Sequence, residues 1–152
     1  ELAPEGQGQL GSLLFKAPGT PGDVDTVVIR YNNAYGVEYR YDRDDNSYLR
    51  YINGRPHTDE ENGEHYRATN IIVQWMDTWP IPYADKGRMD MALMGDGPAQ
   101  YFLDGRTYEG SWRKESVYKP TLFLDQDGQP MHFNHGQTWI MVTPTGSTVT
   151  SS

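Results

Sequence analysis

Apolar and polar residues alternate along several short segments of this chain, and this alternation predicts β-strands. In VEYRYD (37–42), a valine and two tyrosines alternate with charged residues. Successive side chains of a strand point to opposite faces, so this segment offers one face to a core and one to solvent. Strands are also predicted at 26–31, 47–52, 70–76, 88–94, 99–103, 106–113, 121–124, 131–133 and 138–143.

Glycine-containing turn sequences separate these segments. Asn53-Gly54, Asp104-Gly105 and Asp127-Gly128 suit the left-handed conformations of tight hairpins, and Gly95-Asp96-Gly97 is also expected to be a turn. Segment 70–76 is strongly apolar, which predicts a central strand. The pattern therefore predicts a mainly β fold with little helix, an antiparallel sandwich or partly open barrel of about nine or ten short strands.

A long polar segment interrupts this pattern between two predicted strands. Residues 55–70 include two histidines and four acidic residues, and alanine is their largest aliphatic side chain. Such a segment cannot bury itself, so we expect a surface loop, where binding residues and harmless insertions both occur.

Composition places the predicted strands in one domain. The 16 glycines and 10 prolines of the 152 residues suit a turn-rich β-domain, here predicted at 26–144. Residues 1–25 are expected to be a linker or edge segment following a missing N-terminal domain. Residues 145–152 are polar and are expected to form a flexible tail.

Charge and cysteine content exclude several classes of function. The formal net charge is −8, which argues against a nucleic-acid partner or an anionic membrane surface, since both select clustered Lys and Arg. The absence of cysteine excludes disulfides, thiolate metal sites and cysteine nucleophiles. No apolar run approaches membrane-spanning length.

His57 and Asp59 carry the most specific candidate chemistry of the polar loop. In an extended chain they point to the same side, where Glu61, Glu64 or His65 could complete a metal site. Thr58 and Glu61 could instead form a capping box. We expect no metal or other cofactor, and hydrogen bonds that hold the loop against Asn70 at the start of the next strand.

Aromatic residues offer a second candidate surface. Tyrosines and tryptophans in the predicted strands could form a flat face that stacks on sugars or binds extended peptide, or they could pack in the core. Core packing is favoured, and Trp112 and Trp139 are expected to be mainly buried. The candidate binding residues are Arg55, His57, Asp59, Asn70 and Trp112, with no catalytic residue assigned.

Several segments together resemble a known family. The most specific are GRPHTD (54–59), NIIV (70–73), GSWRK (110–114) and GQTWI (136–140). They resemble the C-terminal domain of the YerB-like lipoproteins of Gram-positive bacteria over residues 15–144, with a departure at His65-Tyr66-Arg67. The resemblance implies an exported, lipid-anchored protein on the outer face of the cell membrane, and it implies no activity.

Two classes of function follow from the sequence. The first is a non-catalytic extracytoplasmic binding or scaffolding domain that contacts cell-wall glycan, an envelope protein or its own N-terminal domain. The alternative is a hydrolase of an envelope polymer with a His/carboxylate site near His57 and Asp59. The first is favoured because the sequence contains no nucleophile elbow and no HExxH motif.

Overall fold

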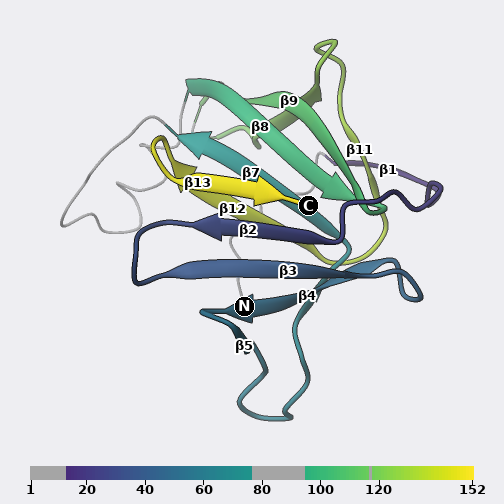
Figure 1. Ribbon diagram of the computed structural model, residues 1–152. Coiled ribbons are helices and arrows are strands. Elements are labelled where there is room, and N and C mark those ends of the chain that lie inside the picture. The colour runs from purple at the N-terminus through teal and green to yellow at the C-terminus, as the bar shows by residue number, and fades with distance from the viewer. Residues whose placement is uncertain (1–12, 77–94, 117) are drawn as a thin grey trace.

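The computed structural model describes residues 13–76, 95–116 and 118–152, and in these residues it contains thirteen strands and no helix (Figure 1). The larger sheet has six strands. They are β13 (Thr148–Ser151), β2 (Thr26–Arg30), β3 (Gly36–Asp42), β4 (Ser47–Ile52) and β5 (Arg55–Pro56) in this order, with β6 (Arg67–Ala68) also paired to β4.

The second sheet has five strands, and a third sheet has two. The order in the five-stranded sheet is β10 (Leu122–Asp125), β9 (Arg106–Lys114), β8 (Gly95–Leu103), β7 (Asn70–Met76) and β12 (Thr138–Pro144). The two-stranded sheet pairs β1 (Leu14–Lys16) with β11 (His132–Asn134) in parallel.

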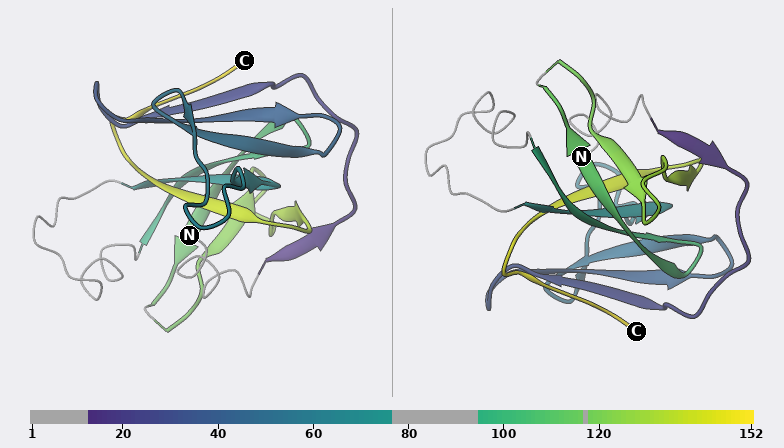
Figure 2. Two further views of the ribbon diagram at one scale, coloured as in Figure 1. Left: turned by 90° about the horizontal axis from the view of Figure 1, so that it is seen from below. Right: turned by 90° about the horizontal axis from the view of Figure 1, so that it is seen from above.

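The two large sheets lie face to face as the layers of a sandwich (Figure 2). Val27, Tyr39 and Tyr48 of the six-stranded sheet pack against Ile71 and Trp139 of the five-stranded sheet, forming one core. The opposite face of the five-stranded sheet forms a second core with β11. The predicted mainly β sandwich is therefore confirmed, and the described residues form no closed barrel.

The central position predicted for segment 70–76 is confirmed, because β7 lies between β8 and β12. It is apolar on both faces because each face lies against one of the two cores. Its pairing with β12 is parallel and joins residues far apart in the chain, such as Ile72 and Ile140. Local alternation carries no information about this pairing.

Hairpin turns form at all three predicted dipeptides, and Gly128 of the third has a φ of 80°. Asn53 and Gly54 have φ of 48° and 82°, and Asp104 and Gly105 have 55° and 67°. The predicted turn at 95–97 is wrong, because these residues open β8 and pair with the end of β9. A side chain at Gly97 would begin 2.9 Å from Nε1 of Trp112, so glycine there permits close packing.

The C-terminal segment also differs from its prediction. Residues 148–151 form β13, which pairs antiparallel with β2, so this part is not a flexible tail. At the other end, residues 14–16 form β1, which pairs with β11. The strand predicted at 88–94 lies outside the described residues.

Candidate functional site

The polar segment expected to be a surface loop folds as a hairpin with its own backbone hydrogen bonds. The amide of Tyr66 donates to the carbonyl of His57 at 2.9 Å, and the amide of Asp59 donates to the carbonyl of Glu64 at 2.8 Å. The amide of His57 also donates to the carbonyl of Arg50, at 3.0 Å, which joins the hairpin to β4. We call residues 57–66 the polar hairpin.

His57 lies at the base of the polar hairpin and faces the core. Its Nδ1 accepts a hydrogen bond from the Arg50 guanidinium. Its ring lies 4.6 Å from the ring of Tyr66 and 6.4 Å from that of Trp139, measured between centroids. Burial lowers the pKa of His57, and the positive charge of Arg50 lowers it further. The imidazole is therefore held neutral, as an acceptor.

Asp59 stabilises the tip of the same hairpin. Its Oδ1 accepts from the amide of Glu61 at 2.7 Å and from that of Asn62 at 3.3 Å. The carboxylate thus caps the turn, whereas Thr58 pairs with His65 across the hairpin. The alternative of a capping box started by Thr58 is accordingly wrong.

Asn70 does not receive His57 or Asp59, so the predicted anchor is wrong. Its side chain is buried and bonds elsewhere: Nδ2 donates to the carbonyl of Asn134 at 2.8 Å and to Oγ1 of Thr138 at 3.0 Å. The amide of Asn134 donates to Oδ1 of Asn70 at 3.0 Å. Asn70 therefore joins β7 to β11 and β12 inside the domain.

The two remaining candidates lie in opposite environments. Arg55 is exposed on the short strand β5. Trp112 is 2% exposed, and its Nε1 donates to the carbonyl of Trp75 at 2.8 Å. Trp139 is 3% exposed, so the expected burial of both tryptophans is confirmed. The ring of Trp112 is a core group and has no surface to offer a ligand.

Arg50 is the central residue of the His57 site, and it was not among the site residues predicted from the sequence. Its side chain is 7% exposed and points between the sheets. Nε donates to the hydroxyl of Tyr39 at 3.1 Å, and the guanidinium carbon lies 4.4 Å from the ring centroid of Trp139. The alternation along β4 could have indicated its position. Arg50 lies two residues after the buried Tyr48, so both side chains point to the same, inward face of the strand.

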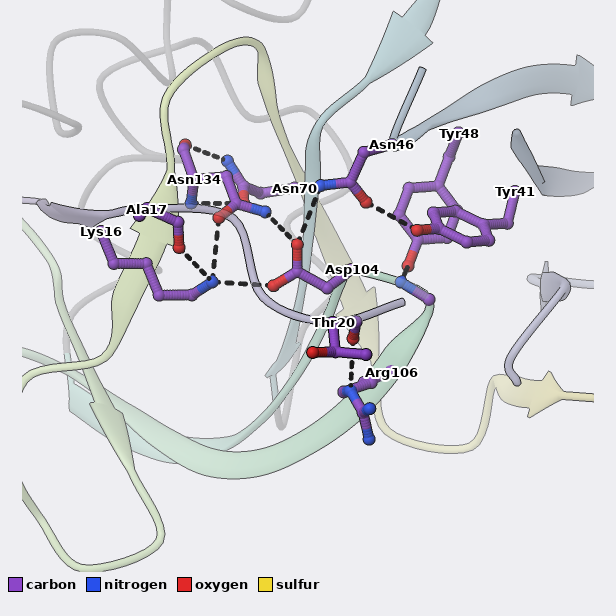
Figure 3. A network of polar contacts seen from close by, with 11 residues as sticks. Lys16, Ala17, Thr20, Tyr41, Asn46, Tyr48, Asn70, Asp104, Arg106 and Asn134 are labelled. Atoms are coloured by element: carbon purple, nitrogen blue, oxygen red, sulfur yellow. Dashed lines mark hydrogen bonds and ion pairs between the residues drawn. The ribbon is translucent and has the colours of Figure 1, made fainter. Parts of the chain in front are cut away.

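A second polar cluster surrounds Asp104 at the turn between β8 and β9 (Figure 3). Asp104 is 1% exposed, and its Oδ2 accepts from Nζ of Lys16 at 2.7 Å. Its Oδ1 accepts from Nδ2 of Asn46 at 2.9 Å and from Nδ2 of Asn134 at 2.7 Å. Burial raises the pKa of Asp104, but the hydrogen bonds from these three side chains outweigh it, and the net pKa is lowered.

This second cluster ties distant parts of the chain together. Lys16 comes from β1, Asn46 from the turn before β4, and Asn134 from β11. Both carboxylate oxygens of Asp104 are used within it. The cluster is therefore a structural junction between these segments.

Metal-binding clusters and membrane-spanning helices are both absent from the residues that the structure describes. No group of three or more His, Asp or Glu side chains in this part of the chain is placed to hold a metal ion. No helix in it is long and apolar enough to cross a membrane.

Comparison with known proteins identifies the family. The profile of the C-terminal domain of the DUF3048 proteins of unknown function matches residues 27–140. The crystal structure of the YerB protein from Bacillus subtilis superimposes with a TM-score of 0.71 and 26% sequence identity, covering 91% of this chain and 46% of that chain. This chain thus spans about half the length of YerB. No curated protein matches. The chain belongs to the family of DUF3048 C-terminal domains.

Proposed function

We propose that this domain is a non-catalytic binding or scaffolding module of a bacterial envelope lipoprotein, and that it contacts a partner protein through the polar hairpin. The observation that carries the proposal is the hairpin itself, a segment held rigidly at its base whose charged tip projects from the sandwich (Figure 1).

The base of the polar hairpin is fixed by contacts with both sheets. His57 and Tyr66 pack against Trp139 of β12, and Nε2 of His65 bonds the carbonyl of Arg50 at 2.6 Å. The acidic side chains of Glu60, Glu61 and Glu64 are exposed beyond this base. A rigid support that presents exposed charged groups favours recognition, because little conformational entropy is lost on binding.

The geometry around the best candidate acid and base does not favour the hydrolase alternative. Nδ1 of His57 faces a cation, so it is not oriented by a carboxylate, and Asp59 is occupied in capping its turn. Asp104 is buried and bonded at both oxygens. None of the three carries the features of a general base that can reach substrate.

Burial of five aromatic residues of the strands favours a protein over a glycan as the partner. Tyr39, Tyr48, Tyr101, Trp112 and Trp139 are all within the two cores. A stacking platform for sugars requires exposed flat rings, and these five residues leave none on the surface. An acidic hairpin is instead suited to a basic protein surface.

The proposed location is the outer face of the cell membrane, through a lipid anchor outside this chain. The similarity to YerB supports the family relationship on which this rests. Because this chain spans 46% of YerB, an N-terminal domain of the whole protein is one candidate partner and a separate envelope protein is another.

Site-specific photo-crosslinking in the whole lipoprotein tests the proposal. A photoreactive residue at Glu61 should crosslink to one protein partner, within the molecule or in the envelope. The same residue at Asp127, in another surface turn, is the control. Replacing Glu60, Glu61 and Glu64 by lysine should abolish the crosslink made from a reporter at Asn62. Equal labelling from both positions, or hydrolysis of envelope polymer by the purified protein, would overturn the proposal.

A further inference from the structure

Arg50 brings a positive charge into the interior without a matching negative charge. The side chain is 7% exposed, and none of the ion pairs among the described residues includes it. Moving an ionised group out of water is costly unless a counter-charge accompanies it. The uncompensated charge in an otherwise acidic protein therefore requires a physical reason.

The groups around Arg50 fix its position but do not neutralise it. The Tyr39 hydroxyl accepts from Nε, His57 accepts from Nη1, and the Trp139 ring lies against the guanidinium. All three are uncharged in these roles, since burial raises the pKa of Tyr39 and lowers that of His57. The guanidinium is thus oriented in advance by neutral partners.

Part of the guanidinium remains available for another partner. Arginine has five N–H donors, and two of them are used, one on Nε and one on Nη1. In the described chain, the one buried side-chain oxygen or nitrogen without a hydrogen-bond partner is Oγ1 of Thr107. Nη2, which no described residue bonds, is therefore not completely shielded from solvent.

We propose that Arg50 anchors a binding site for the carboxylate group of a ligand, which enters beside His57 at the base of the polar hairpin and bonds the free N–H groups of the guanidinium. The site goes beyond the proposed function and does not depend on it, because it lies beneath the hairpin and not at its charged tip.

A carboxylate fits this site better than a phosphate group. One arginine supplies one positive charge, which a carboxylate balances, and the planar guanidinium matches a planar carboxylate. A phosphate dianion would add excess negative charge to a chain with net charge −8. The described residues also contain no helix whose N-terminus could assist phosphate binding.

Arg40 provides a matched control on the neighbouring strand. It also lies over an aromatic ring, 3.9 Å from the ring centroid of Tyr51. Unlike Arg50, it has a carboxylate partner, Glu38, at 2.9 Å, and it is exposed. The two arginines differ in burial and in charge compensation, which are the features that define the proposed site.

Nuclear magnetic resonance can test the site with acetate as the probe. Acetate replaces chloride at constant sodium concentration and neutral pH, and the Nε–H signals of Arg50 and Arg40 and the indole signals of Trp139 and Trp112 are followed. We expect saturable shifts at Arg50 and Trp139, with Arg40 and Trp112 unchanged. Arg50→Gln should weaken acetate binding at least tenfold, and Arg40→Gln should leave it unchanged.

The wild-type titration decides the proposal even if Arg50→Gln does not fold. Shifts that do not saturate, or that are as large at Arg40 as at Arg50, would show that acetate has no defined site and would overturn it. A parallel titration with inorganic phosphate tests the ligand class. Tighter binding of phosphate than of acetate at the same signals would overturn the assignment to a carboxylate.

Discussion

Buried polar side chains organise particular regions of this domain. Asn70 joins three strands, Asp104 joins three distant segments, and Arg50 lies between the sheets beneath the polar hairpin. Their hydrogen bonds are specific in distance and direction, so each residue fixes one arrangement of its neighbours. The charged groups at the hairpin tip are solvated and fix little of the fold.

Protonation of His57 should weaken the folded state in mildly acidic solution. The pKa of its imidazole is lowered on folding, chiefly by burial and then by Arg50, whereas the unfolded chain has the ordinary value of about 6.5. Below about pH 6.5 the unfolded chain therefore binds a proton that the folded chain does not. As the pH is lowered from about 6.5, the free energy of unfolding should decrease until the pH is below the lowered pKa of the folded state. Urea denaturation at several pH values would measure this decrease.

Two histidine variants separate this effect from other titrations. His57→Gln retains a hydrogen-bond acceptor for Arg50 but does not titrate, so its stability should vary less between about pH 7.5 and about pH 5.5. His135→Gln alters an exposed histidine stacked on Phe15 and should retain the wild-type dependence. An unchanged pH profile in His57→Gln would refute this assignment.

Loss of the Trp112 side chain should be strongly destabilising. The residue is 2% exposed and packs in the second core, so Trp112→Ala should lower the free energy of unfolding by about 3–5 kcal/mol. Chemical denaturation measures this loss. Tyr118→Ala is the control, because Tyr118 is 93% exposed and its removal should change little. If the free energy of unfolding of Trp112→Ala were close to that of the wild type, the site would either repack around the missing ring or not belong to the core.

The strand β13 shows how one element completes the larger sheet. It covers the outer edge of β2, and the carbonyl of Ser152 accepts from the amides of Asp25 at 2.7 Å and Thr26 at 3.0 Å. An uncovered strand edge offers unpaired backbone groups to other chains. The C-terminal strand therefore protects this edge as well as adding to the sheet.

Deletion of residues 148–152 should destabilise the domain and expose the edge of β2. Several backbone hydrogen bonds are lost together, so we expect a loss of about 2 kcal/mol or more in the free energy of unfolding. Sedimentation should also reveal self-association. Thr150→Ser keeps the backbone pairing and should behave as the wild type. A monomeric deletion variant of normal stability would show that β13 contributes nothing.

Acidic residues outnumber basic residues in the molecule as a whole. The chain has 21 acidic and 13 basic residues, and most of its ion pairs among the described residues involve exposed side chains. Exposed pairs contribute little to stability, so repulsion among the excess carboxylates is the larger electrostatic effect at neutral pH.

Salt should therefore stabilise the folded domain at neutral pH. Raising sodium chloride from about 10 mM to about 150 mM shortens the range of repulsion between carboxylates, and the melting temperature should rise. The rise should be much smaller near the isoelectric point of about 4.8, where the net charge vanishes. Calorimetry at both pH values measures this rise. If the melting temperature rose equally at both pH values, net charge would not be the cause.

The sequence by itself determined the class of fold and most of its elements. Alternation located β3 and β4, a two-sided apolar run located β7, and Asn53-Gly54 and Asp104-Gly105 located two tight turns. These features are local, because side-chain parity and left-handed backbone depend on a few neighbouring residues. The polar segment could likewise be assigned to the surface from its composition alone.

The tertiary structure decided the pairings and the site. The parallel contact of β7 with β12 and the addition of β13 to β2 join residues far apart in sequence, which local patterns cannot encode. For the same reason, the sequence led to the prediction that His57 pairs with Asn70. Its partner in the structure is Arg50, on the other side of the Asn53-Gly54 turn. Which polar groups meet depends on how the sheets are layered, and only the packed domain fixes that.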